Sequence, residues 1–266
     1  MHDAFGNGVT VNAETLRDEL VTLSRDLGQE ARQLALLGEG NTSVSCGDGT
    51  FWVKASGSSL RTLEKAQVSR VRLEPVLTLL QRDQMDEQAV EDALVAALAD
   101  PGHKKPSVET FLHALCLMLG EATWVGHTHT VSVNQILCSE RGAEPFERHI
   151  FPDAIVVCGL FVASVPYVDP GFALAKVVQA ELKRFAAEHG HPPKLLLMEN
   201  HGVVALGQSA KEVLNIHLMV DKWAKTLQGT YALGGPEFLP DAEAARIDAR
   251  LDEHYRRLEL VRSKDA

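Results

Sequence analysis

The chain has 266 residues, of which 45% are hydrophobic, enough to build the core of one large α/β domain or two small ones. Its formal net charge is −10 and it has no dense run of basic residues, which argues against nucleic acid and anionic membranes as partners. No apolar run is long enough for a membrane-spanning helix, and residues 1–12 are polar, with no apolar signal core.

The 4 cysteines show no Cys-x-x-Cys spacing, and most of them lie in apolar stretches. We interpret them as reduced, buried thiols, which argues against a cysteine-based zinc site. Reduced thiols without a targeting segment predict a cytoplasmic protein.

The N-terminal part of the chain is predicted to contain one long helix and a hairpin. Apolar residues at helical spacing predict a helix over residues 14–37, which Gly38-Glu39-Gly40 ends. Alternating residues at 41–46 and a return strand at 51–54 predict a β-hairpin around the turn Gly47-Asp48-Gly49.

Helices and strands alternate along the rest of the chain. Strands or β-rich runs are predicted at residues 68–73, 122–128, 154–158, 161–165, 194–198 and 203–206. Helices are predicted at residues 74–81, 87–98, 107–119, 131–138, 172–188, 210–227 and 241–260. This interleaving predicts an α/β sandwich with helices flanking a central sheet.

We expect a single domain over residues 1–266. Its core would cover residues 14–235 approximately, and the break at Gly234-Gly235-Pro236 would separate that core from a C-terminal helical segment at 241–262.

The segment Gly126-His127-Thr128-His129 is the most informative motif. On a strand, His127 and His129 project from one face with Cβ atoms about 7 Å apart, so both imidazoles could bind one metal ion. His201, which follows the predicted strand 194–198, is a third candidate ligand, and three histidines with an open position are typical of a catalytic metal site. The structural alternatives are a chance pair among 11 histidines and a hydrogen-bonded turn histidine at 201.

Glu109 is the candidate general base. The helix dipole favours a carboxylate in the first turn of helix 107–119, which is the structural interpretation, and Ser107 is a plausible N-cap of that helix. Beside a metal, the same carboxylate could move a proton at a carbon whose acidity the metal raises.

Small polar residues recur in three loops, at residues 40–43, 56–58 and 106–107. Such loops can present backbone N–H groups and hydroxyls to a phosphate, although most are only turns. The chain has no Gly-x-x-x-x-Gly-Lys-Ser/Thr loop, which argues against nucleotide triphosphate chemistry.

Taken together, these motifs resemble the class II aldolase/adducin family. They occur in the family's order over residues 14–231. The matching stretches are Gly40-Asn41-Thr42-Ser43, Ser56-Gly57, Pro106-Ser107-Val108-Glu109, Gly126-His127-Thr128-His129 and Glu199-Asn200-His201-Gly202. With residues 165–175, they look like the aldolase portion of bacterial rhamnulose-1-phosphate aldolase/dehydrogenase fusion proteins.

The resemblance implies a three-layer α/β/α sandwich with a central mixed sheet, and a small-molecule sugar phosphate or sugar acid as substrate. It implies a divalent metal, zinc or another ion, on His127, His129 and His201, with Glu109 as the acid/base carboxylate. It implies a homo-oligomer, often a tetramer. The residues implied to bind the substrate phosphate are Asn41, Thr42, Ser56, Gly57 and Ser107.

The sequence departs from the family pattern in two places. Val108 stands where many sugar-phosphate aldolases have a second serine. Residues 149–151, in the region of the tyrosine proton donor of the simplest members, contain no tyrosine. Tyr167, Tyr231, Tyr255 or a group of another kind are the candidates to replace it.

The predicted activity is aldolase cleavage of a ketose 1-phosphate or related sugar through a metal-stabilised enediolate. An epimerase, decarboxylase or dehydratase acting on the same site is the alternative, and the sequence does not choose among them. A non-catalytic adducin-like scaffold is the alternative of a different class, and the retention of three histidines and Glu109 argues against it.

Overall fold

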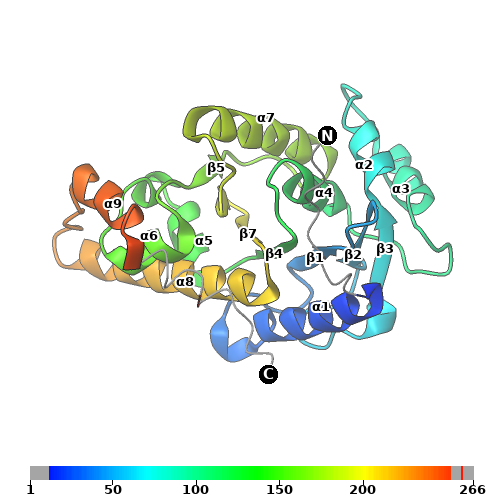
Figure 1. The fold of residues 1–266 in the computed structure, drawn as a ribbon, viewed down its shortest axis with the longest axis horizontal. Coiled ribbons are helices and arrows are strands. Elements are labelled where there is room, and N and C mark those ends of the chain that lie inside the picture. Colours follow the sequence, from blue (N-terminus) through cyan, green and yellow to red (C-terminus); the bar gives the residue numbers. More distant parts are fainter. Residues whose placement is uncertain (1–11, 253–258, 260–266) are drawn as a thin grey trace, which may run out of the picture.

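The structure, a computed structural model, describes residues 12–252 and residue 259. Its strands are β1 (Asn41–Ser45), β2 (Thr50–Lys54), β3 (Val68–Arg72), β4 (Trp124–Thr128), β5 (Ala163–Val165), β6 (Leu195–Met198) and β7 (Gly202–Gly207). Within the described residues they form one seven-stranded sheet, in the order β3-β2-β1-β4-β7-β6-β5, through the middle of the molecule (Figure 1). Neighbouring strands run antiparallel except β5 and β6, which are parallel, so the sheet is mixed, as predicted.

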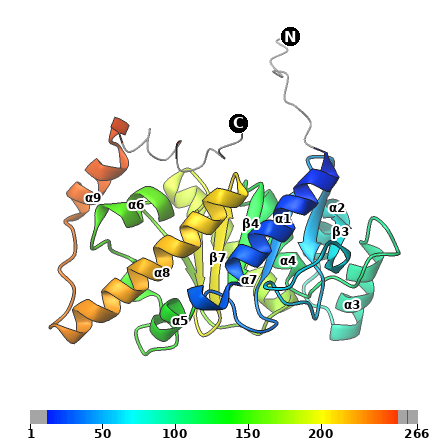
Figure 2. The same cartoon turned by 90° about the horizontal axis from the view of Figure 1, so that it is seen from below.

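Helices cover both faces of this sheet. One layer comprises α1 (Ala13–Leu27), α5 (Val131–Leu137), α6 (Pro152–Cys158) and α8 (Ala210–Ala232). The other comprises α2 (Leu73–Leu79), α3 (Glu87–Ala96), α4 (Thr110–Met118) and α7 (Phe172–His189). Figure 2 shows α1 and α8 lying across the strands. The predicted three-layer α/β/α sandwich is therefore confirmed.

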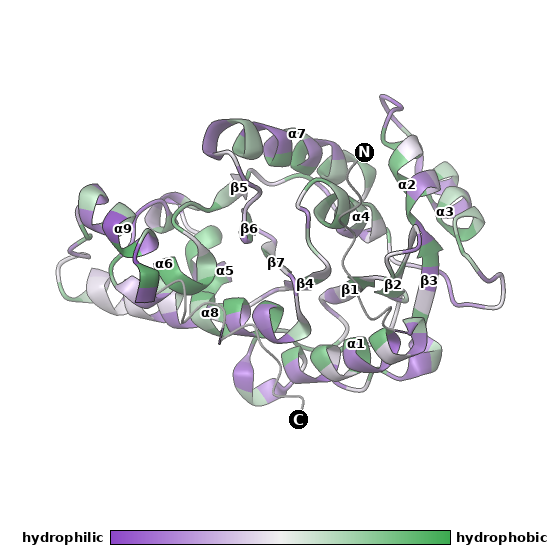
Figure 3. Cartoon of the chain, viewed as in Figure 1, coloured by the Kyte–Doolittle hydropathy of each residue, from purple (hydrophilic) through white to green (hydrophobic). Residues whose placement is uncertain are grey.

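Two hydrophobic cores separate the sheet from its helical layers, because side chains alternate between the faces of each strand. Val44 and Trp52 belong to the core under α1 and α8, whereas Phe51 and Val53 belong to the core under α4 and α7. The helices carry hydrophobic and hydrophilic stretches side by side (Figure 3), as expected for elements with one buried face. Ser43 lies opposite Val53 in the sheet, so polar residues of β1 also face α4.

The C-terminal helix α9 (Asp241–Asp248) packs on α6. Ala244 and Ile247 of α9 contact Ile155 and Val156 of α6 in a small separate core. The predicted helix 241–260 is not continuous: α9 ends at Asp248, and residues 251, 252 and 259 are again helical. Residues 253–258 and 260 lie outside the described part. Among the described residues, no helix has both the length and the hydropathy needed to cross a membrane.

The first predicted helix was wrong in its C-terminal end, because α1 stops at Leu27 rather than continuing to residue 37. At Gly28 an added Cβ would lie 2.3 Å from the backbone nitrogen of Arg61, so the chain is packed against a distant loop there. The apolar pattern extends beyond the end of the helix because later residues also belong to the core: Leu34 is fully buried, although it is not helical.

The prediction of a β-rich run at residues 154–158 was also wrong, since this segment is helix α6. Pro152 stands in its first turn, where a missing N–H costs nothing. The β-branched residues Ile155 and Val156 are buried against α9, and this packing overrides their weak local preference for strands.

Candidate metal centre

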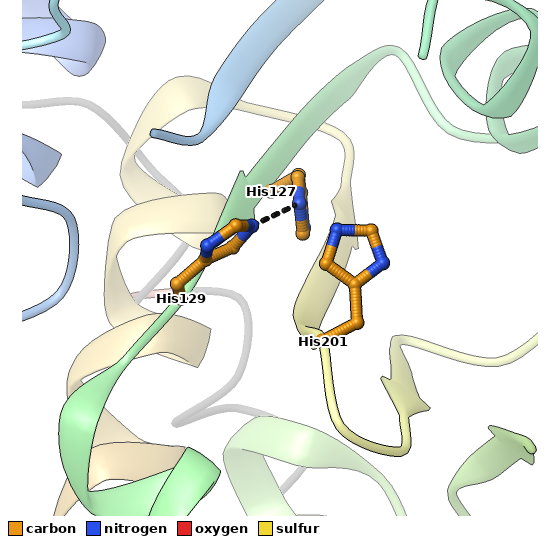
Figure 4. A group of neighbouring side chains, drawn as sticks. All are labelled: His127, His129 and His201. Carbon is orange, nitrogen blue, oxygen red and sulfur yellow. Dashed lines mark hydrogen bonds between the residues drawn. The ribbon is translucent and has the colours of Figure 1, made fainter. Parts of the chain in front are cut away.

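Three imidazoles converge at one end of the inner strands β4 and β7 (Figure 4). His127 belongs to β4, His129 follows β4, and His201 lies in the turn between β6 and β7. Because β4 pairs with β7, that turn lies beside the end of β4. The three ring centroids are 4.9, 4.9 and 5.0 Å apart, and one nitrogen of each ring lies within 4.8 Å of the others. The structure thus brings together the three residues that the sequence singled out.

The spacing of the nitrogens suits a single metal ion. Nε2 of His127 and Nε2 of His129 are 3.1 Å apart. Two nitrogen ligands at the usual zinc distance of about 2.0–2.1 Å would be about 3.3 Å apart in tetrahedral geometry. Imidazole donors suit zinc and also copper, iron and nickel, so the donor set fits a divalent ion without selecting one.

Hydrogen bonds on the far side of two rings orient these nitrogens. Nδ1 of His127 lies 3.1 Å from the carbonyl oxygen of Val203, to which it donates, so Nε2 keeps its lone pair. Nδ1 of His129 lies 3.2 Å from Oε2 of Glu39. The backbone carbonyl of His201 accepts a hydrogen bond from Nδ2 of Asn134 at 3.0 Å, which fixes the turn.

Burial keeps His127 and His129 uncharged. His127 is fully buried, and this lowers its pKa to about 3. Burial, together with the neighbouring His201, also lowers the pKa of His129. Since a metal binds only the deprotonated imidazole, both rings are ready to act as ligands at neutral pH.

The Glu109 carboxylate lies directly against this group. Its Oε1 is 3.5 Å from Nε2 of His127 and 3.2 Å from Nε2 of His201, and its Oε2 accepts a hydrogen bond from Nδ2 of Asn41. Burial alone would raise the pKa of Glu109, but the two imidazoles and the Asn41 amide outweigh it and hold the pKa well below its ordinary value. Glu109 is therefore an ionised carboxylate.

The local position of Glu109 differs from the predicted one. Helix α4 begins at Thr110, so Glu109 is the N-cap and Ser107 lies before it. The Glu109 side chain makes no capping hydrogen bond, and its own N–H donates to Oγ of Ser107 at 3.3 Å. The carboxylate is directed at the imidazoles and not at the helix N-terminus. This argues against the interpretation that Glu109 serves only to stabilise the start of the helix.

Gly202 allows the His201 turn to approach β4. An added Cβ would lie 2.4 Å from the carbonyl oxygen of Thr128 and within about 3 Å of the His127 and His129 rings. Asn200, two residues earlier, has a positive φ of 54°, a conformation that asparagine tolerates better than most residues. The Asn200-His201-Gly202 sequence therefore reflects a tight turn under the site.

The predicted phosphate loops are only partly brought to the imidazoles. A bridge between Ala55 and Pro106 places the Ser56-Gly57 loop beside Ser107, which lies two residues before Glu109. Nζ of the buried Lys54 closes this loop by donating to the carbonyl oxygen of Ser58 at 2.5 Å.

Thr42 faces away from the imidazoles. Its hydroxyl lies 2.6 Å from Oγ of Ser24 in α1, on the face of the sheet opposite to α4. Asn41, one residue earlier, turns to the other face and contacts Glu109. Successive side chains of a strand point to opposite faces of the sheet, so Asn41 and Thr42 lie on opposite faces.

The two departures from the family pattern also have a structural setting. Val108 packs against the core of the α4 and α7 layer, with its Cβ 3.9 Å from the position of a Cβ at Gly171. Tyr167 is exposed and donates to Asp169 at 2.8 Å, and Tyr231 packs under Arg141. Tyr255 lies outside the described residues.

Sequence reasoning missed His113, which lies behind Glu109, and Glu39, which lies behind His129. His113 is fully buried, with Nε2 hydrogen-bonded to Oδ1 of Asn41 and Nδ1 2.7 Å from Oγ of Ser43. The available signal was the spacing Asn41-x-Ser43 on a strand and Glu109-x-x-x-His113 on a helix, since each spacing places two side chains on one face. No local signal marks Glu39.

Comparisons with known proteins agree with this geometry. The family described as Class II Aldolase and Adducin N-terminal domain matches residues 18–227. A protein named "Uncharacterized oxidoreductase YuxG", from Bacillus subtilis (strain 168), is 33% identical over 202 residues, which are 73% of this chain and 27% of that protein. The chain thus spans about a quarter of the length of this curated relative.

Two solved structures share the fold. The N-terminal Class II Aldolase domain of a conserved protein from Thermoplasma acidophilum is 27% identical, with a TM-score of 0.63 over 85% of this chain and 98% of that one. An L-fuculose 1-phosphate aldolase is 17% identical, with a TM-score of 0.65 over 91% of this chain and 98% of that one. At this identity the second likeness concerns the fold alone.

Proposed function

This chain belongs to the class II aldolase and adducin family, and on that premise we propose that it is a divalent-metal-dependent aldolase acting on a ketose 1-phosphate or a related sugar substrate. The observation that carries the proposal is the convergence of three imidazoles with one ionised carboxylate, Oε1 of which lies 3.2 and 3.5 Å from two of their nitrogens. These separations are those expected between groups that meet at one ion and its substrate.

His127, His129 and His201 would hold the ion, with zinc as the proposed metal. When bound, it would supply Lewis-acid stabilisation of the negative charge that an enediolate develops as a carbon–carbon bond breaks. Neutral imidazoles leave the positive charge of the ion undiminished, unlike thiolate ligands, and none of the 4 cysteines belongs to the group.

Glu109 would move the proton at the nucleophilic carbon of the substrate. The carboxylate is ionised at neutral pH, which is the form that can accept that proton. Asn41 binds Oε2 and leaves Oε1 toward the imidazoles, so the carboxylate is oriented for this role.

The loops beside Glu109 support an anionic substrate. The Ala55–Pro106 bridge brings the Ser56-Gly57 loop next to Ser107. We propose that the N–H and hydroxyl groups of these residues bind the phosphate of the substrate, together with Asn41, which contacts Glu109. We also propose a homo-oligomer, a tetramer by family resemblance.

The test is a product analysis with a panel of ketose 1-phosphates and sugar acids. We expect two smaller fragments whose masses sum to that of the substrate, loss of this reaction with a chelator, and its return when a divalent ion is added. A product of unchanged mass would indicate an epimerase, loss of carbon dioxide a decarboxylase, and loss of water a dehydratase. Turnover that is insensitive to chelation would contradict the proposal.

A further inference from the structure

A chain of buried hydrogen bonds runs behind the Glu109 carboxylate. Oε2 of Glu109 accepts from Nδ2 of Asn41, and Oδ1 of Asn41 is hydrogen-bonded to Nε2 of His113. Nδ1 of His113 lies 2.7 Å from Oγ of Ser43. Ser43 and His113 are fully buried, and Asn41 is 3% exposed, so no bulk water competes for these groups.

Two regular elements present the four side chains. Asn41 and Ser43 are two residues apart on β1 and share the face that is turned toward α4. Glu109 and His113 are one helical turn apart at the start of α4, where the N–H of His113 donates to the carbonyl oxygen of Glu109 at 3.1 Å. The chain therefore follows from how β1 and α4 pack.

The carboxylate fixes the direction of every bond in the chain. An ionised carboxylate can only accept, so Asn41 must turn its NH₂ group toward Glu109 and its Oδ1 toward His113. His113 must then carry its proton on Nε2, which leaves a lone pair on Nδ1 for the hydroxyl proton of Ser43. Burial lowers the pKa of His113 to about 4, which agrees with this neutral form.

We propose that His113 is a positioning residue for the reaction, acting on Glu109 through the orientation of the Asn41 amide. Without a donor at Nε2, Oδ1 of Asn41 loses its hydrogen bond, and the amide is held only by the carboxylate that it should position. The carboxylate would then keep a hydrogen-bond partner but lose its fixed position. This inference rests on the proposed role of Glu109.

Other buried histidines lack this arrangement. His149 donates from Nε2 to the carbonyl oxygen of Leu160 at 2.9 Å, and His217 uses Nδ1 with the carbonyl oxygen of Val213 at 2.8 Å. Within the described residues, the remaining ring nitrogen of each has no hydrogen-bond partner. Both nitrogens of His113 are engaged, and one of them leads to the catalytic carboxylate.

The first test is the tautomer of His113 in the purified protein, read from ¹⁵N NMR of protein with labelled histidine. The signal is assigned by its loss in His113→Gln. We expect the Nε2–H tautomer at neutral pH. The Nδ1–H tautomer would overturn the proposal, because Asn41 would then face Glu109 with its oxygen. This readout is independent of activity, so it stands even if the proposed lyase reaction fails.

The second test compares His113→Leu with His113→Gln. Leucine fills the space without a donor, whereas glutamine keeps an N–H near the place of Nε2. We expect His113→Leu to lower kcat by about 10–100-fold with KM nearly unchanged, and His113→Gln to restore most of the loss. His149→Leu is the matched control for removing a buried imidazole, and it should leave kcat unchanged in folded protein.

A double-mutant cycle separates positioning from a general loss of structure. In the Glu109→Gln background, His113→Leu should have no further effect on kcat, because its route to the reaction is already removed. Equal losses in the wild-type and Glu109→Gln backgrounds, or full kcat in His113→Leu, would overturn the proposal.

Discussion

A group of three imidazoles and a single buried imidazole elsewhere in this molecule can be compared directly. At the end of β4 and β7, His127, His129 and His201 turn ring nitrogens toward one another, and His127 and His201 contact Glu109. Beside α8, His149 stacks on Trp223 with ring centroids 4.6 Å apart. Burial lowers the pKa of His127 and His149 alike. A neutral, buried imidazole is therefore no sign of a site by itself, whereas convergence of several on a carboxylate is.

The largest expected effect comes from the carboxylate. Glu109→Gln should lower kcat by about 10²–10⁴-fold, because general acid–base catalysis contributes about that much, while leaving the metal bound to the histidines. Steady-state kinetics and metal analysis of the same sample measure both. Unchanged turnover would remove Glu109 from the proton-transfer role.

The groups behind the ligands should have a smaller but clear effect. Glu39→Gln removes the carboxylate 3.2 Å from Nδ1 of His129, and we expect metal affinity to fall about 10–100-fold, as is typical of such partners. Competition with a chromophoric chelator measures it. Glu30→Gln, on an exposed carboxylate paired with Arg61, is the matched control and should leave affinity unchanged. Equal affinity in Glu39→Gln and wild type would show that His129 is oriented by other contacts.

The turn at residues 200–202, which carries His201, offers a third test of the difference between the metal centre and the other buried imidazoles. Gly202→Ala would place a methyl group 2.4 Å from the Thr128 carbonyl oxygen, so the turn must shift and carry His201 with it. We expect a loss of about 1–3 kcal/mol of unfolding free energy, together with weaker metal binding. Gly229→Ala, inside helix α8, is the control: an added Cβ meets nothing within 4 Å there, so metal binding should be unchanged, and the unfolding free energy should rise by about 0.5–1 kcal/mol because alanine favours the helix.

Acid should lower the stability of the metal-free protein through its fully buried imidazoles, inside the metal centre and outside it. His127, His113 and His217 have folded-state pKa values of about 3, 4 and 4, below the ordinary 6.5 of the unfolded chain. Between pH 6.5 and about 4 the unfolded state therefore binds more protons, so the unfolding free energy of metal-free protein should fall as pH falls through this window. Denaturant titrations at several pH values measure it, and a stability that is flat from pH 7 to 4 would contradict the buried, neutral imidazoles.

Much of the fold could be predicted from local sequence patterns. Alternating residues around Gly47-Asp48-Gly49 predict the β1–β2 hairpin, because strand alternation and turn chemistry are encoded within a few residues. The pair His127 and His129 could be predicted as facing the same way for the same reason. His201 could be predicted to lie near a strand end, although only the pairing of β4 with β7 places it beside them.

What could not be predicted depends on contacts between distant segments. The end of α1 is set where Gly28 meets Arg61, and α6 is helical because it packs against α9. His113 and Ser43 are 70 residues apart and meet only when β1 and α4 pack. No sequence pattern within one segment indicates a contact between two distant segments, so the contact between Ser43 and His113 could not be predicted.

The central claim is that His127, His129 and His201 hold one divalent ion. The most direct test is the metal content of purified wild-type protein, His127→Gln and His149→Gln, measured by inductively coupled plasma mass spectrometry after gel filtration. We expect about one ion per chain in wild type and in His149→Gln, and a large loss in His127→Gln. Equal metal content in wild type and His127→Gln, or no bound metal in folded wild-type protein, would contradict it.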